Sequence, residues 1–142
     1  MNDTATFSDC RHCLCLASRS VARTITSAYD RRLRPHGLRA TQLTILTMLA
    51  LRGATPILAL AKSLAMDRTT LTRNLSLLES KGWIATRDDK NDARSHLASV
   101  TARGRAVAHA ALPAWREAQS AVAAALGSDA AALQRLGSRR IE

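Results

Sequence analysis

Residues 67–104 constrain the fold of this chain more than any other segment. The segment opens with Leu71, Leu75 and Leu78 at helical spacing, which makes one face of a helix apolar. Gly82 suits the end of that helix. Two short strand-like runs follow, joined by a charged loop: residues 83–87 and 95–100. This part of the chain is therefore predicted to be an amphipathic helix followed by a β-hairpin.

Helical periodicity also marks the chain before this segment. Apolar residues predict a long amphipathic helix from about Ser8 to Leu33, which residues 34–37 end because they contain Pro and Gly. Thr41 is expected to cap a second helix, and Thr55 a third with Pro56 at its first position. Inward-facing positions expected in these two helices are Leu43, Leu46, Leu49, Ala50, Leu58, Ala61 and Leu64.

Asp67 is expected to cap the fourth helix. Two short helices joined by a tight turn, the second with a polar face and a following hairpin, indicate a winged helix-turn-helix. After the hairpin, Thr101 is expected to cap a long Ala-rich helix through about Leu126, bent near Pro113. A shorter last helix is expected to be capped by Asp129. The predicted fold class is mainly α with a small β wing, in one domain spanning 1–142.

The charge of the chain points to a polyanionic partner. There are 21 Lys and Arg residues against 11 Asp and Glu, a formal net charge of +10, which is common among nucleic-acid binders. Charge alone does not separate DNA from RNA or an anionic membrane. The N-terminus has no signal-peptide pattern, and no apolar run is long enough to span a bilayer, so we expect a cytoplasmic protein without a membrane partner.

Short motifs in a fixed order resemble the MarR family of bacterial transcription regulators across nearly the whole chain. They are Leu60-Ala61, Met66-Asp67, the run from Leu78 to Ile84, Asp92-Ala93-Arg94 and the run from Val100 to Gly104. The sequence departs from the family pattern at Val100, where a leucine is usual, and in the acidic residues of the wing, Asp88 and Asp89.

The resemblance implies a homodimer whose first and last helices intertwine, here within 8–34 and 104–142, around a winged helix-turn-helix at 41–101. Independent support comes from the terminal segments, which carry apolar stripes that one small winged domain could not wholly bury. A dimer suits a palindromic operator in double-stranded DNA, because it presents two reading helices one helical turn apart, roughly 34 Å.

The polar face of the fourth helix is expected to enter the major groove. Its candidate contacts are Thr69, Thr70, Thr72, Arg73 and Ser76, with Arg68 nearer to phosphate. Arg73 is the candidate for a bidentate contact with guanine. In the wing, the resemblance implies that Arg94 enters the minor groove and that Asp92 orients it by a salt bridge. Arg87 and Lys90 are expected to attract phosphate without reading sequence.

An N-terminal cluster contains Cys10, His12, Cys13 and Cys15. Thiols near basic residues at a helix start favour the thiolate, which oxidises and binds metal. In one regular helix Cys15 points away from Cys13, so a metal ion or iron–sulfur cluster needs either a non-helical start or cysteines from both subunits. The first helix also resembles the peroxide-sensing branch of the family. The alternative interpretation makes these cysteines small buried hydrophobes at the dimer interface.

Two further hypotheses stay open at this stage. Family habit suggests a small aromatic effector in a cleft lined by Tyr29, His36 and Arg39, which could equally be ordinary packing and surface residues. The alternative to a regulator, most simply a repressor released by its effector, is a cysteine-dependent redox or metal enzyme without a DNA role. No metalloprotease, hydrolase or nucleotide-binding motif occurs, so the sequence favours a non-enzyme.

Overall fold

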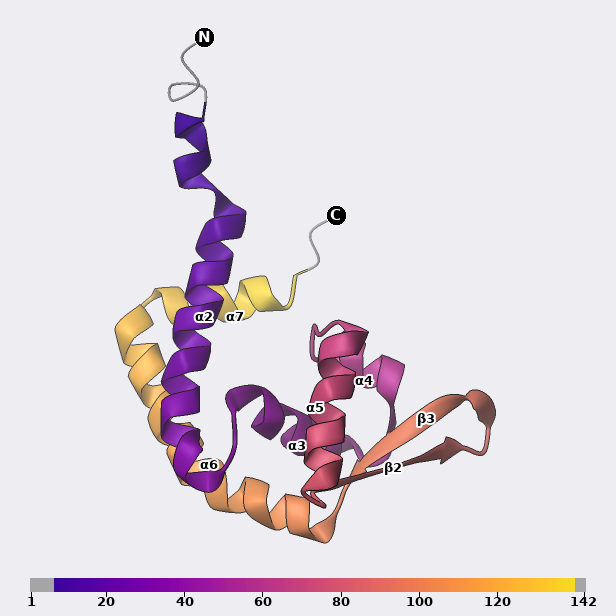
Figure 1. The fold of residues 1–142 in the computed structure, drawn as a ribbon. Helices are drawn as coiled ribbons and strands as arrows, with labels where there is room; N and C mark the ends of the chain where they lie inside the picture. The colour runs from indigo at the N-terminus through magenta and orange to yellow at the C-terminus, as the bar shows by residue number, and fades with distance from the viewer. Residues whose placement is uncertain (1–6, 140–142) are drawn as a thin grey trace.

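A computed structural model describes residues 7–139 of the chain. Its helices and strands follow in the order η1 (Ser8–His12), α2 (Leu14–Leu33), η2 (Arg34–His36), α3 (Ala40–Arg52), β1 (Thr55–Pro56), α4 (Ile57–Ser63), α5 (Arg68–Ser80), β2 (Ile84–Asp89), β3 (Asp92–Val100), α6 (Ala102–Leu126) and α7 (Asp129–Gly137). Figure 1 shows α2 and the later part of α6 side by side on one side of the molecule, while the β2–β3 wing projects from the other. The mainly helical fold with a small wing is confirmed.

The core lies between α3, α4, α5 and the base of the wing. Leu46 and Leu49 of α3 and Leu60 of α4 are fully buried, as are Leu71 and Leu78 of α5. The apolar stripe expected from the spacing of the leucines in α5 therefore packs inward, which leaves the polar stripe of the same helix to solvent. Burying one large aliphatic side chain contributes about 1.5–3 kcal/mol, so these leucines hold α5 firmly in place.

The start of the third helix differs from expectation. Thr55 and Pro56 do not begin α4 but form β1, which pairs antiparallel with Ala98 and Leu97 of β3. This pairing adds a third strand to the sheet, in the order β1-β3-β2. The helix then begins at Ile57, one residue later than predicted, which turns Leu58 outward to 61% exposure. The prediction that Leu58 faces the core was wrong. Thr55 and Pro56, which were expected to start the helix, pair instead with β3, a strand distant in the sequence.

The wing is longer than the hairpin expected from the sequence. The strands run to Asp89 and from Asp92, so only Lys90 and Asn91 remain in the turn. The antiparallel register runs from Ile84 opposite Val100 to Asp88 opposite His96, and it shifts between Asp88 and Asp89. Charged residues that were expected in a loop therefore stand on paired strands, which fixes their directions.

The wing joins α6 through a tight junction at Thr101. The Thr101 hydroxyl accepts a hydrogen bond from Gly104 N–H at 3.0 Å and donates one to the Gly82 carbonyl at 2.7 Å, while Thr101 N–H donates to the Trp83 carbonyl at 3.0 Å. The expected cap is confirmed. These bonds draw α6 so close to Trp83 that Gly104 has no room for a side chain.

The remaining helix boundaries differ slightly from expectation. The α2 helix starts at Leu14, after the short 3-10 helix η1, instead of near Ser8. The caps of α3 and α7 are Arg39 and Ser128, not Thr41 and Asp129. No helix within residues 7–139 is both long and apolar enough to cross a membrane.

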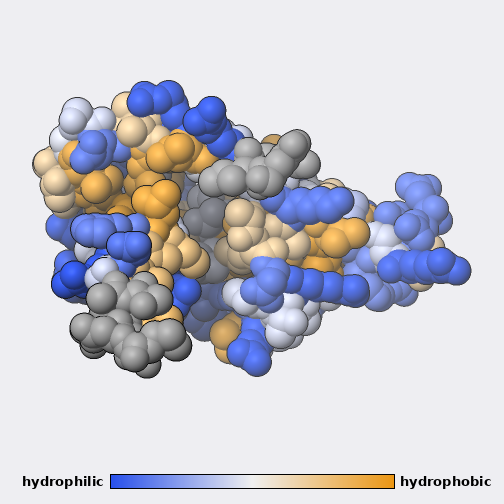
Figure 2. Space-filling view, turned by 90° about the horizontal axis from the view of Figure 1, so that it is seen from above, coloured by the Kyte–Doolittle hydropathy of each residue, from blue (hydrophilic) through white to orange (hydrophobic). Residues whose placement is uncertain are grey.

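The terminal helices expose a broad apolar surface. Figure 2, which looks down from the N-terminal side, shows hydrophobic side chains gathered over these helices, whereas the wing is hydrophilic. The exposed residues include Leu14, Leu16, Val21, Trp115, Leu133 and Leu136, of which Leu14 is 84% exposed. Exposed apolar surface on this scale marks an interaction site in a folded protein.

Candidate nucleic-acid interface

The α5 helix begins at a charged cap. Asp67 accepts hydrogen bonds from the Thr70 N–H at 2.8 Å and from the Thr70 hydroxyl at 2.6 Å, which confirms Asp67 as the N-cap. These bonds, the hydroxyl's above all, lower the pKa of the Asp67 carboxyl. The carboxylate therefore stays ionised at neutral pH and stabilises the N-terminus of α5 through the helix dipole.

The polar face of α5 forms one open concavity of about 630 Å³. It is lined by Arg68, Thr69, Thr72, Arg73, Ser76 and Leu77. Five of these six are residues that the sequence placed at DNA. All five are exposed, and they stand on the face opposite the buried leucines. The arrangement suits insertion into a groove, because the side chains project from a helix whose other face is fixed in the core.

Two residues on α5 depart from the expected set. Thr70 is exposed but does not line the concavity, and its hydroxyl donates a hydrogen bond to Asp67. Leu77 lines the concavity and is 53% exposed, but it was not among the residues expected at DNA. The signal available for Leu77 was its spacing, four residues after Arg73.

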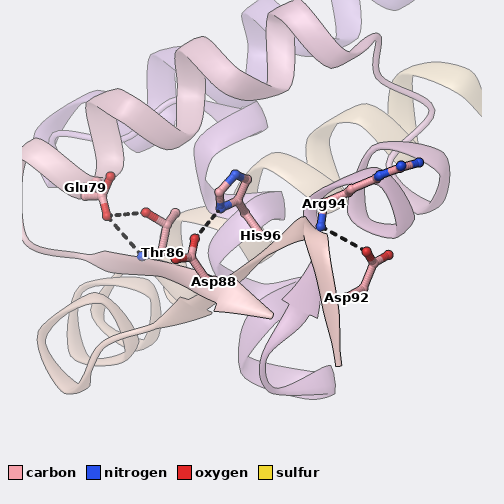
Figure 3. A network of polar contacts seen from close by, with 6 residues as sticks. All are labelled: Glu79, Thr86, Asp88, Asp92, Arg94 and His96. Atoms are coloured by element: carbon pink, nitrogen blue, oxygen red, sulfur yellow. Dashed lines mark hydrogen bonds and ion pairs between the residues drawn. The ribbon is translucent and has the colours of Figure 1, made fainter. Parts of the chain in front are cut away.

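Arg94 stands near the tip of the wing with its guanidinium directed away from the body of the strand pair (Figure 3). Asp92 accepts a hydrogen bond from the backbone N–H of Arg94 at 3.0 Å. Among residues 7–139 no ion pair joins the two side chains, so the salt bridge expected between them is replaced by a backbone contact. Asp92 therefore shapes the chain at Arg94 and leaves the guanidinium free for another partner.

A second concavity, of about 660 Å³, connects α5 to the wing. Arg68 and Thr72 of α5 and Arg94 of the wing all line it, and Lys62 of α4 adds a positive charge that the sequence reasoning missed. Asp89 and Asp92 also line it, so the charges are mixed. The structure thus brings the two separately predicted parts of the site to one surface. Arg87 and Lys90 lie on the wing outside this concavity and are exposed.

Carboxylates on the wing and on α5 make further contacts that sequence reasoning did not anticipate. The carboxylate of Asp88 lies 3.0 Å from Nδ1 of His96, directly across the strands (Figure 3). Glu79, near the end of α5, accepts hydrogen bonds from Thr86 of β2. Strand register and helix-to-strand distance decide these contacts, and neither quantity can be read from residue types.

The N-terminal cysteines are all exposed in the single subunit. Cys10 lies in η1, Cys13 is the extended residue before α2, and Cys15 lies in the first turn of α2. The guanidinium of Arg19 is 3.8 Å from the Cys15 Sγ. Within the described part of the chain, no three His, Cys, Asp or Glu side chains are placed to hold a metal ion.

The three residues proposed for a ligand cleft have different surroundings. The Tyr29 hydroxyl donates a hydrogen bond to Oε1 of Gln119 on α6, and partial burial raises the pKa of the phenol. Tyr29 therefore joins α2 to α6 as a neutral group. Arg39 lines a small concavity with Arg34 and Lys81, whereas Tyr29 and His36 do not. The structure does not bring the three candidates to one cleft within a subunit.

Comparison with known proteins adds independent findings. A family model described as the MarR family matches residues 38–96. The multiple antibiotic resistance protein MarR of Salmonella typhimurium is 36% identical over 75 residues, covering 53% of this chain. The match spans 52% of that protein, about half of its length.

Solved structures match over nearly the whole chain. One is the transcriptional regulator MosR of M. tuberculosis in complex with DNA, 36% identical, covering 89% of this chain and 96% of that chain with a TM-score of 0.76. A probable transcriptional regulator from Pseudomonas aeruginosa is 27% identical, covering 92% of this chain and 98% of that chain with a TM-score of 0.78.

Proposed function

The chain belongs to the MarR family of transcription regulators, and from this premise we propose that it binds operator DNA through α5 and the wing. In this proposal α5 enters the major groove and Arg94 enters the neighbouring minor groove. The bound protein represses transcription by covering the operator. Family membership favours this role over a cysteine-dependent enzyme. We also propose that the protein works in the cytoplasm, as expected of a regulator that binds chromosomal DNA.

The observation that carries the proposal is the second concavity. Arg68 and Thr72 from α5 and Arg94 from the wing line it together, although more than 20 residues separate Thr72 from Arg94. The sugar–phosphate backbone of a duplex runs between its major and minor grooves, so an element in each groove must leave room for that backbone between them. Lys62 and Arg68 supply positive charge at that place.

We propose a homodimer formed by the exposed apolar surface of the terminal helices. Removing this surface from water provides the driving force for association. A two-fold axis through the terminal helices gives each dimer two copies of α5 and two wings, which fits an operator made of two inverted half-sites. Each dimer then makes every contact twice, so the binding free energy from one half-site is added to that from the other.

Thiol oxidation is the effector mechanism that fits a single subunit. Cys10, Cys13 and Cys15 are exposed, and the Arg19 guanidinium lies 3.8 Å from the Cys15 Sγ. A hydroperoxide would oxidise an exposed cysteine to a sulfenic acid with release of an alcohol, or of water when the oxidant is hydrogen peroxide. A metal ion or cluster would instead require cysteines from both subunits, and a small aromatic anion near Arg39 is the other candidate effector.

Arg94→Ala tests the docking geometry. We expect operator affinity to fall about tenfold, equivalent to roughly 1.4 kcal/mol, because the wing loses its minor-groove contact. The unfolding temperature should not change, since the guanidinium makes no hydrogen bond within residues 7–139. Fluorescence anisotropy with a labelled operator measures the affinity. Arg23→Ala, which removes the same charge from an exposed position on α2, is the control and should bind as the unaltered chain does.

The cysteines are tested by replacing all three with Ser. In reducing buffer the variant should bind the operator as the unaltered chain does, because none of the three lies at α5 or the wing. After treatment with a hydroperoxide, the unaltered chain should lose affinity at least tenfold, and the variant should retain it. Equal operator affinities of the two proteins after treatment would show that the cysteines do not control DNA binding.

A further inference from the structure

The end of α5 and the outer strand of the wing are joined by a contact that the predicted DNA-binding residues do not explain. Oε1 of Glu79 accepts a hydrogen bond from the Thr86 N–H at 3.0 Å and another from the Thr86 hydroxyl at 2.7 Å (Figure 3). Glu79 lies in the last turn of α5, and Thr86 is the third residue of β2. One carboxylate oxygen thus connects the two DNA-binding elements directly.

The contact satisfies a backbone donor at the sheet edge. The strand order β1-β3-β2 leaves one side of β2 without a partner strand, so N–H groups on that side need other acceptors. Glu79 is such an acceptor for Thr86. Hydrogen bonds to a charged oxygen are roughly twice as strong as neutral ones. The wing is therefore fixed to α5 at Thr86 as well as at its root, where Trp83 and Ile84 are buried.

The distance between α5 and the wing matters because the two elements must enter adjacent grooves of one duplex together. The paired register of β2 and β3 makes them move as one unit, so a displacement of Thr86 also displaces Arg94. We infer that Glu79 is a positioning residue: it holds the wing at the spacing in which Arg73 and Arg94 reach DNA together. A wing positioned before binding loses less conformational freedom when DNA binds. The inference rests on the proposed function.

Charge distinguishes this role from a direct contact. Glu79 is negative and exposed, so its own interaction with phosphate is repulsive, and its removal by itself should strengthen DNA binding. A loss of affinity when Glu79 is shortened would have the opposite sign. The direction of the change in DNA affinity therefore distinguishes the loss of the Thr86 contact from the loss of the charge.

The test compares Glu79→Gln with Glu79→Ala. Gln loses the charge but keeps a side-chain oxygen that can accept both hydrogen bonds, whereas Ala loses the charge and the acceptor. Binding is measured with a duplex that the unaltered chain selects from a random-sequence pool. We expect Glu79→Gln to bind at least as tightly as the unaltered chain, and Glu79→Ala to bind about tenfold more weakly than Glu79→Gln. In an Arg94→Ala background this difference should shrink to less than about twofold, because the wing contact is already lost.

Three outcomes would overturn the inference, two from DNA binding and one from hydrogen exchange. Equal affinities of the Ala and Gln variants would show that the contact does not affect binding. A tenfold difference that persists unchanged with Arg94→Ala would show that Glu79 does not act through the wing. Amide hydrogen exchange at Thr86 provides a measurement without DNA, and exchange should be faster in Glu79→Ala than in Glu79→Gln. Equal exchange would show that Glu79 does not hold Thr86 in place, which overturns the inference. Failure of the unaltered chain to select any duplex would overturn the proposed function instead.

Discussion

Arg73→Ala is expected to weaken operator binding roughly 100-fold and to relax the choice of sequence. Arg73 lies at the centre of the exposed face of α5, between Thr69 and Leu77 in the same concavity. A bidentate contact between arginine and guanine contributes about 1–3 kcal/mol, and a dimer makes that contact twice. Loss of both contacts should affect the preferred operator strongly and unrelated DNA much less, because phosphate attraction remains.

The measurement is a pair of titrations, one with the selected operator and one with a duplex in which each expected guanine contact is replaced. The unaltered chain should discriminate between the two duplexes, and the Arg73→Ala variant should not. Lys90→Ala at the tip of the wing is the matched control, because it removes one exposed charge and should lower affinity for both duplexes alike. Unchanged discrimination in Arg73→Ala would remove this residue from base reading.

Gly104→Ala is expected to destabilise the fold by at least about 3 kcal/mol, at the upper end of the usual cost of overpacking. A Cβ atom at Gly104 would lie 1.9 Å from the Trp83 carbonyl oxygen and 2.7 Å from its carbon. Backbone atoms cannot rotate away as a side chain can, and the same carbonyl is bonded to Thr101. The clash between the added Cβ and the Trp83 carbonyl is therefore removed only if α6 moves away from the base of the wing. A loss of this size is a large part of the stability of a typical domain.

Urea unfolding at a fixed protein concentration measures this loss, because the stability of a dimer depends on concentration. Gly137→Ala is the matched control, since Gly137 is also helical but has no atom within 4 Å of the added Cβ. That variant should unfold at the same urea concentration as the unaltered chain or a higher one. Identical midpoints for Gly104→Ala and Gly137→Ala would contradict the close approach of α6 to Trp83.

Local sequence patterns predicted the elements whose signals lie within a few residues. Asp67 caps α5 and Thr101 caps α6 as expected, and the buried leucines of α5 follow from their spacing. The polar face of α5 was predictable for the same reason, because burial of one stripe determines which stripe remains exposed. The proximity of that face to Arg94 is a feature of the tertiary structure. It could be predicted only from the family resemblance, not from local sequence patterns.

Long-range pairing decided the features that could not be predicted. Thr55 and Pro56 have a sequence typical of a helix start, yet they pair with strand β3 in the sheet. The helix starts after them, and Leu58 is exposed. The contact of Glu79 with Thr86 depends on how the wing folds back beside α5. Asp92 could accept a hydrogen bond from either the guanidinium or the backbone N–H of Arg94. Only the three-dimensional course of the strand shows that it accepts from the backbone N–H.

Selection of DNA from a random pool shows whether the unaltered chain reads a specific operator. The protein is mixed with a pool of random-sequence duplexes, the bound fraction is recovered and amplified over several rounds, and the enriched sequences are read. We expect an inverted repeat whose half-site centres lie about 10–10.5 base pairs apart, bound with an affinity that falls steeply as salt increases. A folded, dimeric protein that enriches no sequence over the starting pool would contradict this expectation.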